Sequence, residues 1–359
     1  MKILFISRAY PPVTGGIENQ NHALSVWLKK FADVTTVANH YGKKALPLFL
    51  PYVTLRTLFT ASRFDVILLG DGVLAFVGFV VKLVYPKKTI VSVIHGLDLT
   101  YQNAFYQQLW VHCFLPSLDG LIAVSKETRN VALTKNIPEQ KVIVISNGVD
   151  PQALRKEYER EHLEKFLGVD LSEKQVLLTT GRLAKRKGAA WFIREVLPLL
   201  PQSVLYVLAG AGPEEENIKS AIKDTRTENQ VKLLGRVSDN DRNLLINTAD
   251  IFVQPNIHVP GDMEGFGIAV IEATACGRPV IASNLEGLKD AISHNESGIL
   301  VEPNNPIAFK EAITDLLTDT EKRQALGKRA LFYTETHYHW NIIARLYVEA
   351  LEAFNKKQY

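Results

Sequence analysis

The sequence predicts an α/β protein made of two Rossmann-like domains, each built on a doubly wound parallel sheet. Its 359 residues exceed what one ordinary hydrophobic core holds, so two domains are expected. Short continuous runs of Val, Ile and Leu alternate with helical patterns in both halves, which is typical of parallel strands buried on both faces. A charged, helix-prone stretch at residues 151–168 interrupts the alternation and separates the halves.

In the first half the apolar runs predict six strands, with helices between most of them. The strands are expected at Lys2–Ser7, Val34–Ala38, Asp65–Leu69, Thr89–Ile94, Gly120–Val124 and Val142–Ile145. The helices are expected at Ile17–Phe31, Gly72–Val84, Ala104–Leu115 and Lys126–Thr134.

In the second half the same alternation predicts six further strands. They are expected at Gln175–Thr180, Val204–Ala209, Val231–Leu234, Ile251–Gln254, Pro279–Ala282 and Gly298–Val301. Helices are expected at Ala189–Leu199, Glu214–Ile222, Asn240–Asn247, Phe266–Cys276, Ile307–Leu317 and beyond Thr320. The last helical pattern, Trp340–Phe354, is expected to pack back on the first domain. The predicted domains are therefore 1–160 joined by 338–359, and 161–337.

Charge is distributed unevenly along the chain. Residues 1–150 carry 15 Lys and Arg against 9 Asp and Glu, and the remainder carries 26 against 29. A basic first half suggests an anionic partner such as lipid headgroups or a lipid-phosphate acceptor. An uneven surface without a partner remains the alternative.

Cysteine usage and hydrophobicity predict a cytoplasmic protein. Cys113 and Cys276 lie far apart, which argues against a disulfide framework. No signal peptide is expected at the start, and the most apolar stretch, 72–85, is too short to span a bilayer. Lys43-Lys44 and the apolar residues 46–52 predict peripheral contact with an anionic inner membrane face, or else an internal loop and helix covering the sheet.

Unusual residues gather where the strands of the first half end, the edge at which doubly wound sheets bind ligands. Gly15 and Gly16 follow the first strand and open a helix that carries Glu18. His95 follows the fourth strand, and Asn147-Gly148 follows the sixth. The glycine pairs are also compatible with plain turns, and an isolated histidine is often structural.

In the second half, basic and acidic residues follow two strands. Arg182 and Lys187 bracket the loop after strand 175–180. Glu264 begins a glycine-rich turn, and Glu272 falls on the helix that follows. Helix-start N–H groups bind phosphate or sugar oxygens, while carboxylates accept hydrogen bonds from hydroxyls. The pattern therefore predicts a phosphorylated polyol as ligand, and a nucleotide-sugar fits.

Taken together, the sequence resembles the retaining, nucleotide-sugar-dependent glycosyltransferases of group 1. Their fold is GT-B, two Rossmann-like parallel-sheet domains facing a central cleft, and the family includes phosphatidylinositol mannosyltransferases and polysaccharide-biosynthesis enzymes. The motifs that carry the resemblance are Gly181-Arg182 with Lys187-Gly188, Gly210-Ala211-Gly212-Pro213, Gly235-Arg236-Val237 and Glu264 through Glu272. The first half matches more loosely, through Gly15-Gly16, His95-Gly96 and Asn147-Gly148.

The resemblance implies a role for each matching residue. Arg182 and Lys187 would bind the donor diphosphate and stabilise the departing phosphate, and His95 would contact the donor sugar near the reacting centre. Glu264 would hold hydroxyls of the transferred sugar, and Glu272 would bind the nucleotide ribose. The other implied donor-binding residues are Gly16, Val237, Gly265, Phe266, Gly267 and Ile268. Gly15 and Glu18 would lie on the acceptor side.

The resemblance implies transfer of a hexose, of mannose or glucose type, with retention of anomeric configuration. GDP-mannose and UDP-glucose are the donors considered, and the acceptor would be a lipid-linked group or a saccharide. Because lysine and arginine supply the charge that stabilises a leaving diphosphate, no cofactor and no metal are expected. Nucleic acid is not an expected partner, since the basic residues form no aromatic-interleaved stripe.

Several other functions remain as alternatives. A nucleotide-sugar epimerase on the same fold would need no separate acceptor, and a non-catalytic sugar-nucleotide binder would need no chemistry. A glycosidase using Glu264 and Glu272 would leave Arg182 and Lys187 without a purpose. The run from Gly70 to Ala75 matches a loose dinucleotide fingerprint, but it follows the third strand rather than the first, which argues against NAD.

Overall fold

The computed structural model describes residues 1–13 and 15–356 and divides the chain into two compact units. Unit 1 comprises residues 1–148, 261–266 and 338–359, and unit 2 comprises 149–260 and 267–337. The sequence-based limits place residues 149–160 in the first domain and residues 261–266 in the second. The structure groups 149–160 with unit 2 and 261–266 with unit 1. The segment 261–266 carries Glu264, so its place bears directly on the site.

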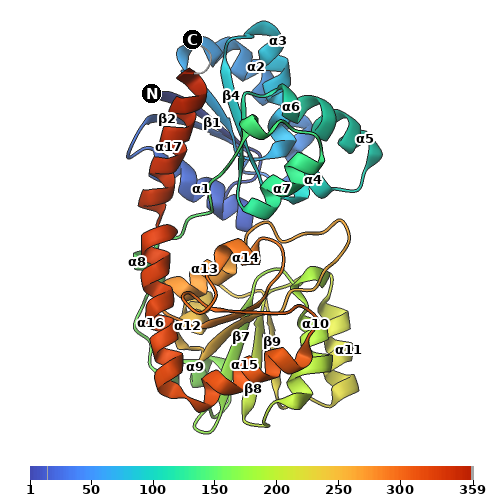
Figure 1. The fold of residues 1–359 in the computed structure, drawn as a ribbon, viewed down its shortest axis with the longest axis vertical. Coiled ribbons are helices and arrows are strands. Elements are labelled where there is room, and N and C mark those ends of the chain that lie inside the picture. Colours follow the sequence, from blue (N-terminus) through green and yellow to red (C-terminus); the bar gives the residue numbers. More distant parts are fainter. Residues whose placement is uncertain (14, 357–359) are drawn as a thin grey trace. The chain divides into compact units, whose positions relative to one another are not determined.

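Unit 1 is built on a six-stranded parallel sheet with helices around it (Figure 1). Its strands are β1 (Lys2–Ser7), β2 (Asp33–Ala38), β3 (Val66–Leu69), β4 (Thr89–Ile94), β5 (Gly120–Ala123) and β6 (Val142–Val144), in the order β2-β1-β3-β4-β5-β6. All six predicted strands are confirmed, with ends shifted by at most one residue. The chain leaves β1 on one side and returns on the other, so the switch point of the sheet lies between β1 and β3.

The helices of unit 1 connect these parallel strands. The main ones are α1 (Gly16–Leu28), α2 (Leu46–Thr60), α3 (Ala75–Val84), α4 (Leu97–Thr100), α7 (Lys126–Thr134) and α17 (Trp340–Lys356). Short 3₁₀ turns lie at Lys43–Ala45 (η1), Ala61–Arg63 (η2), Gly72–Leu74 (η3) and Glu139–Lys141 (η5). The predicted helix Gly72–Val84 therefore begins as a 3₁₀ turn, capped by the Asp71 side chain.

One predicted helix differs in kind from the structure. The stretch expected as a regular helix over Ala104–Leu115 consists of α5 (Ala104–Tyr106), a π-helical segment η4 (Gln107–Phe114) and α6 (Leu115–Ser117). Pairs of aromatic rings from this stretch pack together, with Tyr106 and Trp110 stacked at 5.5 Å between ring centroids. Hydrophobic periodicity does not distinguish a π-helix from an α-helix over so short a run.

Helix α17 returns from the end of the chain to complete unit 1, as the sequence predicts. It lies against α1 and β4 and buries Trp340, Ile343, Ala344, Tyr347, Leu351 and Phe354. The Trp340 ring covers Gly148, and the Phe354 ring covers Gly120, so closely that a Cβ at either glycine would collide with the ring.

Unit 2 repeats the architecture. Its strands are β7 (Gln175–Thr180), β8 (Val204–Ala209), β9 (Val231–Gly235), β10 (Ile251–Gln254), β11 (Val280–Ser283) and β12 (Ile299–Val301), all parallel in the order β12-β11-β10-β7-β8-β9 (Figure 1). All six predicted strands are again confirmed within one residue. The strand order reverses between β7 and β10, and this is the switch point of the second sheet.

The helices of unit 2 follow the predicted order. They are α8 (Pro151–Leu154), α9 (Arg160–Leu167), α10 (Ala189–Trp191), α11 (Glu215–Thr225), α12 (Asp239–Thr248), α13 (Ile268–Ala275), α14 (Leu288–Ala291), α15 (Pro306–Thr318) and α16 (Thr320–His337). Helix α10 continues through a π segment η7 (Phe192–Val196) into a 3₁₀ turn η8 (Leu197–Leu199), and η6 (Lys185–Lys187) precedes it. Within the described residues no helix is both long and apolar enough to cross a bilayer, and both cysteines are free thiols.

Candidate functional site

The glycine pair of unit 1 lies at the switch point of its sheet. Gly15 follows β1 and is the N-cap residue of α1, and Gly16 begins the helix and is exposed. The Glu18 carboxylate folds back over Gly15, so closely that a Cβ there would collide with Glu18 Oε2. One turn on, Gln20 exchanges hydrogen bonds with the backbone of Gly148, which ties the start of α1 to the loop after β6.

His95 stands directly after β4 at the same edge of the sheet and is half-buried. Its Nε2 lies 3.0 Å from the Gly70 carbonyl oxygen and donates to it, because a carbonyl oxygen only accepts. Its backbone N–H donates to Asp98 Oδ2 at 3.1 Å. The ring is therefore held at Nε2, and the backbone of the same residue is held by Asp98.

A buried charged pair supports this histidine, and the sequence analysis did not identify it. Arg8 Nε donates to Asp71 Oδ1 at 2.9 Å, and Asp98 Oδ2 accepts from the Gly72 N–H at 3.1 Å. Burial raises the pKa of Asp71, while Arg8 opposes that rise. Arg8, Asp71 and Asp98 each follow a strand, at the edge where His95 lies, and this placement is the signal that could have found them.

The segment 261–266 packs against His95 within unit 1. Gly265 approaches the His95 carbonyl oxygen so closely that a Cβ would collide with it, and the Met263 side chain lies 3.1 Å from where a Cβ on Gly96 would be. Thr100 Oγ1 lies 3.4 Å from the Gly261 carbonyl oxygen. Glu264 is buried in this segment. The structure therefore brings the predicted sugar-binding glutamate and the predicted catalytic histidine into one unit.

Phe266 anchors the end of that segment. It is almost fully buried, and its ring meets Tyr338 edge to face with 5.5 Å between centroids. The next residue, Gly267, has φ = 101° and is the N-cap of α13 in unit 2. The nine residues from Glu264 to Glu272 thus start in one unit and end on a helix of the other.

In unit 2 the loop after β7 lies at the switch point between β7 and β10. It begins at Gly181, with φ = 120°, and ends at Gly188, with φ = 68°. A Cβ at Gly188 would collide with the Pro255 carbonyl oxygen at the end of β10. Both glycines therefore adopt conformations that other residues rarely adopt, and Gly188 also permits a close approach of two strand ends.

Arg182 and Lys187 lie at opposite ends of this loop but in different surroundings. Arg182 is exposed, and the structure gives its guanidinium no hydrogen bond or ion pair within the described residues. Lys187 ends the 3₁₀ turn η6 and is only 8% exposed. The loop thus carries one cation that is largely removed from water, Lys187, and one that is exposed to it, Arg182.

The neighbouring glycine loops support the loop after β7. Leu183 N–H donates to the Ala211 carbonyl at 3.1 Å, and Gly210 N–H donates to the Gly235 carbonyl at 2.7 Å. Gly210 and Gly212 each lie so close to this loop that a Cβ would collide with its backbone oxygens. Val237, half-buried, follows β9 at the same edge.

Glu272 lies on α13 with a counter-ion that the sequence analysis missed. Arg242 Nη1 of α12 lies 3.7 Å from Glu272 Oε1. Burial raises the pKa of Glu272, and Arg242 partly opposes this effect. Arg242 Nε is itself buried without a hydrogen-bond partner within the described residues. Arg242 and Glu272 lie on different helices and are far apart in the sequence, so no sequence motif predicts that they pair.

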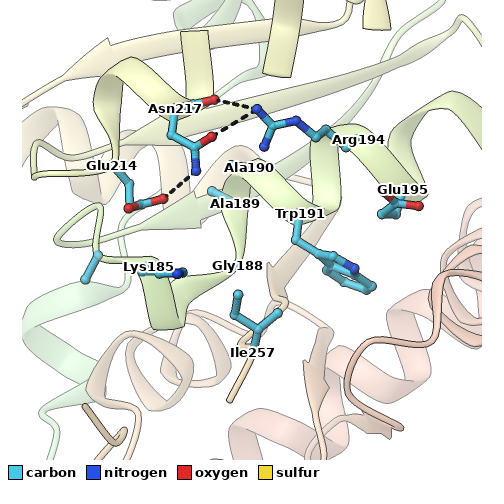
Figure 2. A pocket seen from close by; sticks show the side chains of 11 residues that line it. Lys185, Gly188, Ala189, Ala190, Trp191, Arg194, Glu195, Glu214, Asn217 and Ile257 are labelled. Carbon is cyan, nitrogen blue, oxygen red and sulfur yellow. Dashed lines mark hydrogen bonds between the residues drawn. The ribbon is translucent and has the colours of Figure 1, made fainter. Parts of the chain in front are cut away.

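A surface hollow of about 190 Å³ lies beside this loop but does not coincide with the predicted site. Lys185, Trp191 and Ile257 line it (Figure 2). Its polar rim is satisfied internally, because Arg194 donates to Asn217 at 2.9 Å and Asn217 donates to Glu214 at 2.7 Å. Lys185 therefore lines a hollow to which Lys187 does not contribute, although the two lysines share one turn.

The predicted residues thus form two groups. In unit 1 lie Gly15, Gly16, Glu18, His95, Glu264, Gly265 and Phe266, and in unit 2 lie Arg182, Lys187, Val237, Gly267, Ile268 and Glu272. Among residues 1–13 and 15–356, no three His, Cys, Asp or Glu side chains gather as metal ligands. The expectation that no metal takes part stays a prediction.

Two family models match the chain. Residues 163–331 match the glycosyl transferases group 1 model, and residues 14–153 match the glycosyltransferase family 4 model. An uncharacterized glycosyltransferase of Methanocaldococcus jannaschii is 27% identical, with 96% of each chain covered. A GDP-mannose-dependent alpha-(1-6)-phosphatidylinositol monomannoside mannosyltransferase of Mycobacterium tuberculosis is 24% identical, also with 96% of each chain covered.

Solved structures agree with these matches at the level of the fold. The Anabaena HepE protein, crystallised in complex with UDP, superposes with a TM-score of 0.81 over 98% of this chain and 100% of its own, at 22% identity. The predicted GT-B fold is confirmed by such neighbours. The two matched models and the named relatives show that the chain is a glycosyltransferase, with a group 1 domain over residues 163–331 and a family 4 domain over residues 14–153.

Proposed function

We propose that this glycosyltransferase moves a hexose from a nucleoside-diphosphate sugar to a lipid-linked or saccharide acceptor, with retention of anomeric configuration. The observation that carries the proposal is the packing of the Glu264 segment against His95 in unit 1. Gly265, which contacts the His95 backbone, directly follows Glu264, whose carboxylate is suited to sugar hydroxyls, and the His95 imidazole is suited to the reacting centre. The relatives that use GDP-mannose and UDP support a nucleotide donor.

The leaving diphosphate is assigned to the loop after β7. Breaking the bond between sugar and phosphate places negative charge on the phosphate, and fixed cations lower the barrier most where water is excluded. Lys187 is buried and so meets that condition, while exposed Arg182 supplies a second charge from the other end of the loop. The N-terminus of α13, beginning at Gly267 and Ile268, adds backbone N–H groups.

The nucleoside is assigned to the adjoining strand ends of unit 2. Glu272 would accept hydrogen bonds from the ribose hydroxyls, with Arg242 partly opposing the rise in its pKa that burial causes. Val237 follows β9 beside the glycine loops and would contact the base. Gly16 would approach the phosphate from unit 1, and Gly15 and Glu18 would face the acceptor. A cytoplasmic location and independence of metal belong to the same proposal.

A nucleotide panel tests the donor class. Thermal unfolding of the protein is measured with GDP, UDP, ADP and NAD, on the native chain and on Glu272→Ala. A ligand at 100 times its Kd stabilises the folded state by about 2.7 kcal/mol, so a selective nucleotide raises the Tm measurably. A rise with GDP or UDP that Glu272→Ala abolishes supports the proposal. A rise in Tm with NAD alone contradicts the proposal, and so does the absence of a rise with any of the four nucleotides.

Turnover separates the remaining alternatives. The matching nucleotide-sugar is incubated with and without candidate acceptors, and the products are examined by NMR. Acceptor-dependent release of the nucleoside diphosphate with an unchanged anomeric configuration supports retaining transfer. Conversion of one sugar nucleotide into another without an acceptor would identify an epimerase, which the family match disfavours. Tight nucleotide binding without turnover would identify a binder.

A further inference from the structure

Helix α2 carries apolar side chains on its outer face as well as on the face that packs against the core. Leu48, Tyr52, Leu55 and Phe59 recur at helical spacing on its outer face and are 81%, 52%, 57% and 81% exposed. The inner face buries Phe49 and Val53, but also two threonines. Soluble domains rarely expose a contiguous apolar stripe unless something covers it.

The two buried threonines of α2 find their hydrogen-bond partners within the helix. Thr54 Oγ1 donates to the Leu50 carbonyl at 2.7 Å, and Thr57 Oγ1 donates to the Val53 carbonyl at 2.6 Å. Their hydroxyls are therefore satisfied by the helix itself and need no water. The helix could present polar residues outward without loss of internal packing, yet it presents leucine, tyrosine and phenylalanine.

The charged residues in the stretch of sequence that contains this stripe are all basic. No Asp or Glu occurs between Asp33 and Asp65, while Lys43, Lys44, Arg56 and Arg63 fall in that interval. All four basic residues are exposed. Lys43 and Lys44 precede the helix in η1, and Arg63 follows it in η2, so cations flank the apolar stripe at both ends.

A cationic hollow adjoins the end of the same helix. It has a volume of about 340 Å³, and Lys2, Arg56 and Arg63 line it together with Thr60. Asp33 is an acidic residue in its wall. Three cations against one carboxylate suit a phosphate group, and the hollow lies beside the apolar stripe rather than at the predicted donor site.

We propose that the outer face of α2 docks on the surface of a bilayer that contains anionic lipids, with Leu48, Tyr52, Leu55 and Phe59 entering the acyl boundary and the hollow at Arg56 and Arg63 receiving a lipid phosphate. An apolar stripe flanked by Lys and Arg is the pattern by which helices bind in the plane of such a surface. A second copy of this chain is a poorer occupant. A two-fold contact through this face would place the Arg56 and Arg63 of each copy against a like-charged surface.

The docking surface is oriented usefully for the chemistry. Helix α2 follows β2 and precedes β3, so it begins near the carboxyl edge of the sheet and ends at the opposite edge. Its 15 residues span about 22 Å at 1.5 Å per residue. A bilayer along α2 therefore extends to the edge that carries Gly15, Gly16 and His95, where a lipid-linked acceptor would arrive. The docking itself depends on no feature of the donor site.

Vesicle co-sedimentation of the full chain tests the proposal, without any nucleotide. The vesicles are phosphatidylcholine alone, and phosphatidylcholine with phosphatidylglycerol in equal parts. Binding to the mixed vesicles is expected to exceed binding to the neutral ones and to fall as salt rises. Arg56→Gln/Arg63→Gln is expected to weaken it by about 30-fold, since each basic residue at such a surface contributes roughly 1 kcal/mol. Leu55→Ser/Phe59→Ser is expected to weaken binding to both kinds of vesicle.

Two matched variants serve as controls. Lys165→Gln/Lys223→Gln removes two exposed cations from unit 2, and Phe332→Ser removes an exposed aromatic residue there. Both are expected to bind like the native chain. Equal binding by all variants, or no preference for the anionic vesicles, would overturn the proposal. Self-association that Leu55→Ser/Phe59→Ser abolishes, with no vesicle binding, would assign the face to a second copy. Nucleotide binding by the same variants reports separately on the donor site.

Discussion

Lys187 and Lys185 share one 3₁₀ turn but lie in different surroundings. Lys187 is buried at the switch point of the unit 2 sheet, whereas Lys185 is exposed and lines the separate hollow of Figure 2. A lysine at this edge of a doubly wound sheet is placed to meet an anionic ligand, and the burial of Lys187 shields such a contact from water.

Replacing these two lysines in turn tests that assignment. Lys187→Gln is expected to lower kcat by about 10²–10³-fold, because the loss of one preorganised group from a developing anion typically has that effect. Lys185→Gln is expected to leave kcat unchanged. Both rates are measured by release of nucleoside diphosphate, with the donor that the nucleotide panel identifies. Equal losses in the two variants would show that net charge, not position, is what matters.

Glu272 gives a second expectation, for the pH dependence of nucleotide binding. Burial raises its pKa above the ordinary value of 4.5, so it takes up a proton at a higher pH than a solvated carboxyl. The ionised form accepts hydrogen bonds at both oxygens from ribose hydroxyls, and the protonated form accepts fewer. Affinity is therefore expected to be complete at high pH and to fall as pH drops through that raised pKa, at values above 4.5.

Calorimetric titration of the nucleotide across this pH range provides the measurement. Glu272→Gln is expected to bind weakly and with little dependence on pH, because its amide does not titrate. A native profile that stays flat down to the ordinary carboxyl pKa would separate Glu272 from the ribose. An unaltered profile in Glu272→Gln would do the same.

At this scale the sequence predicted the residues that stand in motifs and missed those that support them. Arg182, Lys187, Glu264 and Glu272 are recognisable because a fixed spacing joins them to glycines. Arg242 is not, because its relation to Glu272 arises only when α12 and α13 lie together. Arg8, Asp71 and Asp98 likewise meet only once the strands of unit 1 align.

Among the elements, Gly168 and Gly188 of unit 2, two glycines in the left-handed conformation, make a natural comparison. Gly168 ends α9 with φ = 64° and has nothing within 4 Å of its missing Cβ. Gly188 ends η6 with φ = 68°, and its missing Cβ would collide with the Pro255 carbonyl oxygen. The two therefore share a backbone conformation and differ in the approach of β10.

Substituting alanine at each separates these effects. Gly168→Ala is expected to lower the free energy of unfolding by about 1–2 kcal/mol, the cost of a left-handed conformation with a side chain. Gly188→Ala is expected to lose roughly 1–3 kcal/mol more, because the added methyl group overfills a packed contact. Urea unfolding of both variants gives the values. Equal losses would show that the backbone after β10 moves to accommodate the added methyl group without cost.

Two elements were left open or described differently by the sequence analysis, each for its own physical reason. Helix α2 contains Pro47 and Pro51, which disfavour an interior helix, but Pro47 lies in the first turn, where no N–H is required. The π segment Gln107–Phe114 has the same apolar content as an α-helix, and only its tertiary contacts distinguish it. By contrast, all twelve strands were predicted from apolar runs, and the signal is fullest in the central strands, where burial on both faces makes nearly every residue apolar.

For the whole molecule, the dependence of unit 1 on its last helix leads to a further expectation. Deleting residues 338–359 removes the ring that covers Gly148 and the ring that covers Gly120, together with the hydrogen bond from Thr89 to Asn355. Exposure of the apolar surface beneath α17 is expected to destabilise unit 1 and to leave unit 2 protected. Hydrogen exchange read along the chain checks this. Comparable loss of protection in 1–148 and 149–260 would contradict it.

The same helix has a consequence for how the protein is made. Residues 1–148 leave the ribosome first, but their core lacks α17 until about 190 further residues have been added. At usual rates of synthesis this interval lasts roughly 10–40 seconds. Throughout it the nascent first unit exposes the apolar surface that α17 later covers, while unit 2 assembles behind it. The half of the protein that is translated first is therefore the half that is completed last.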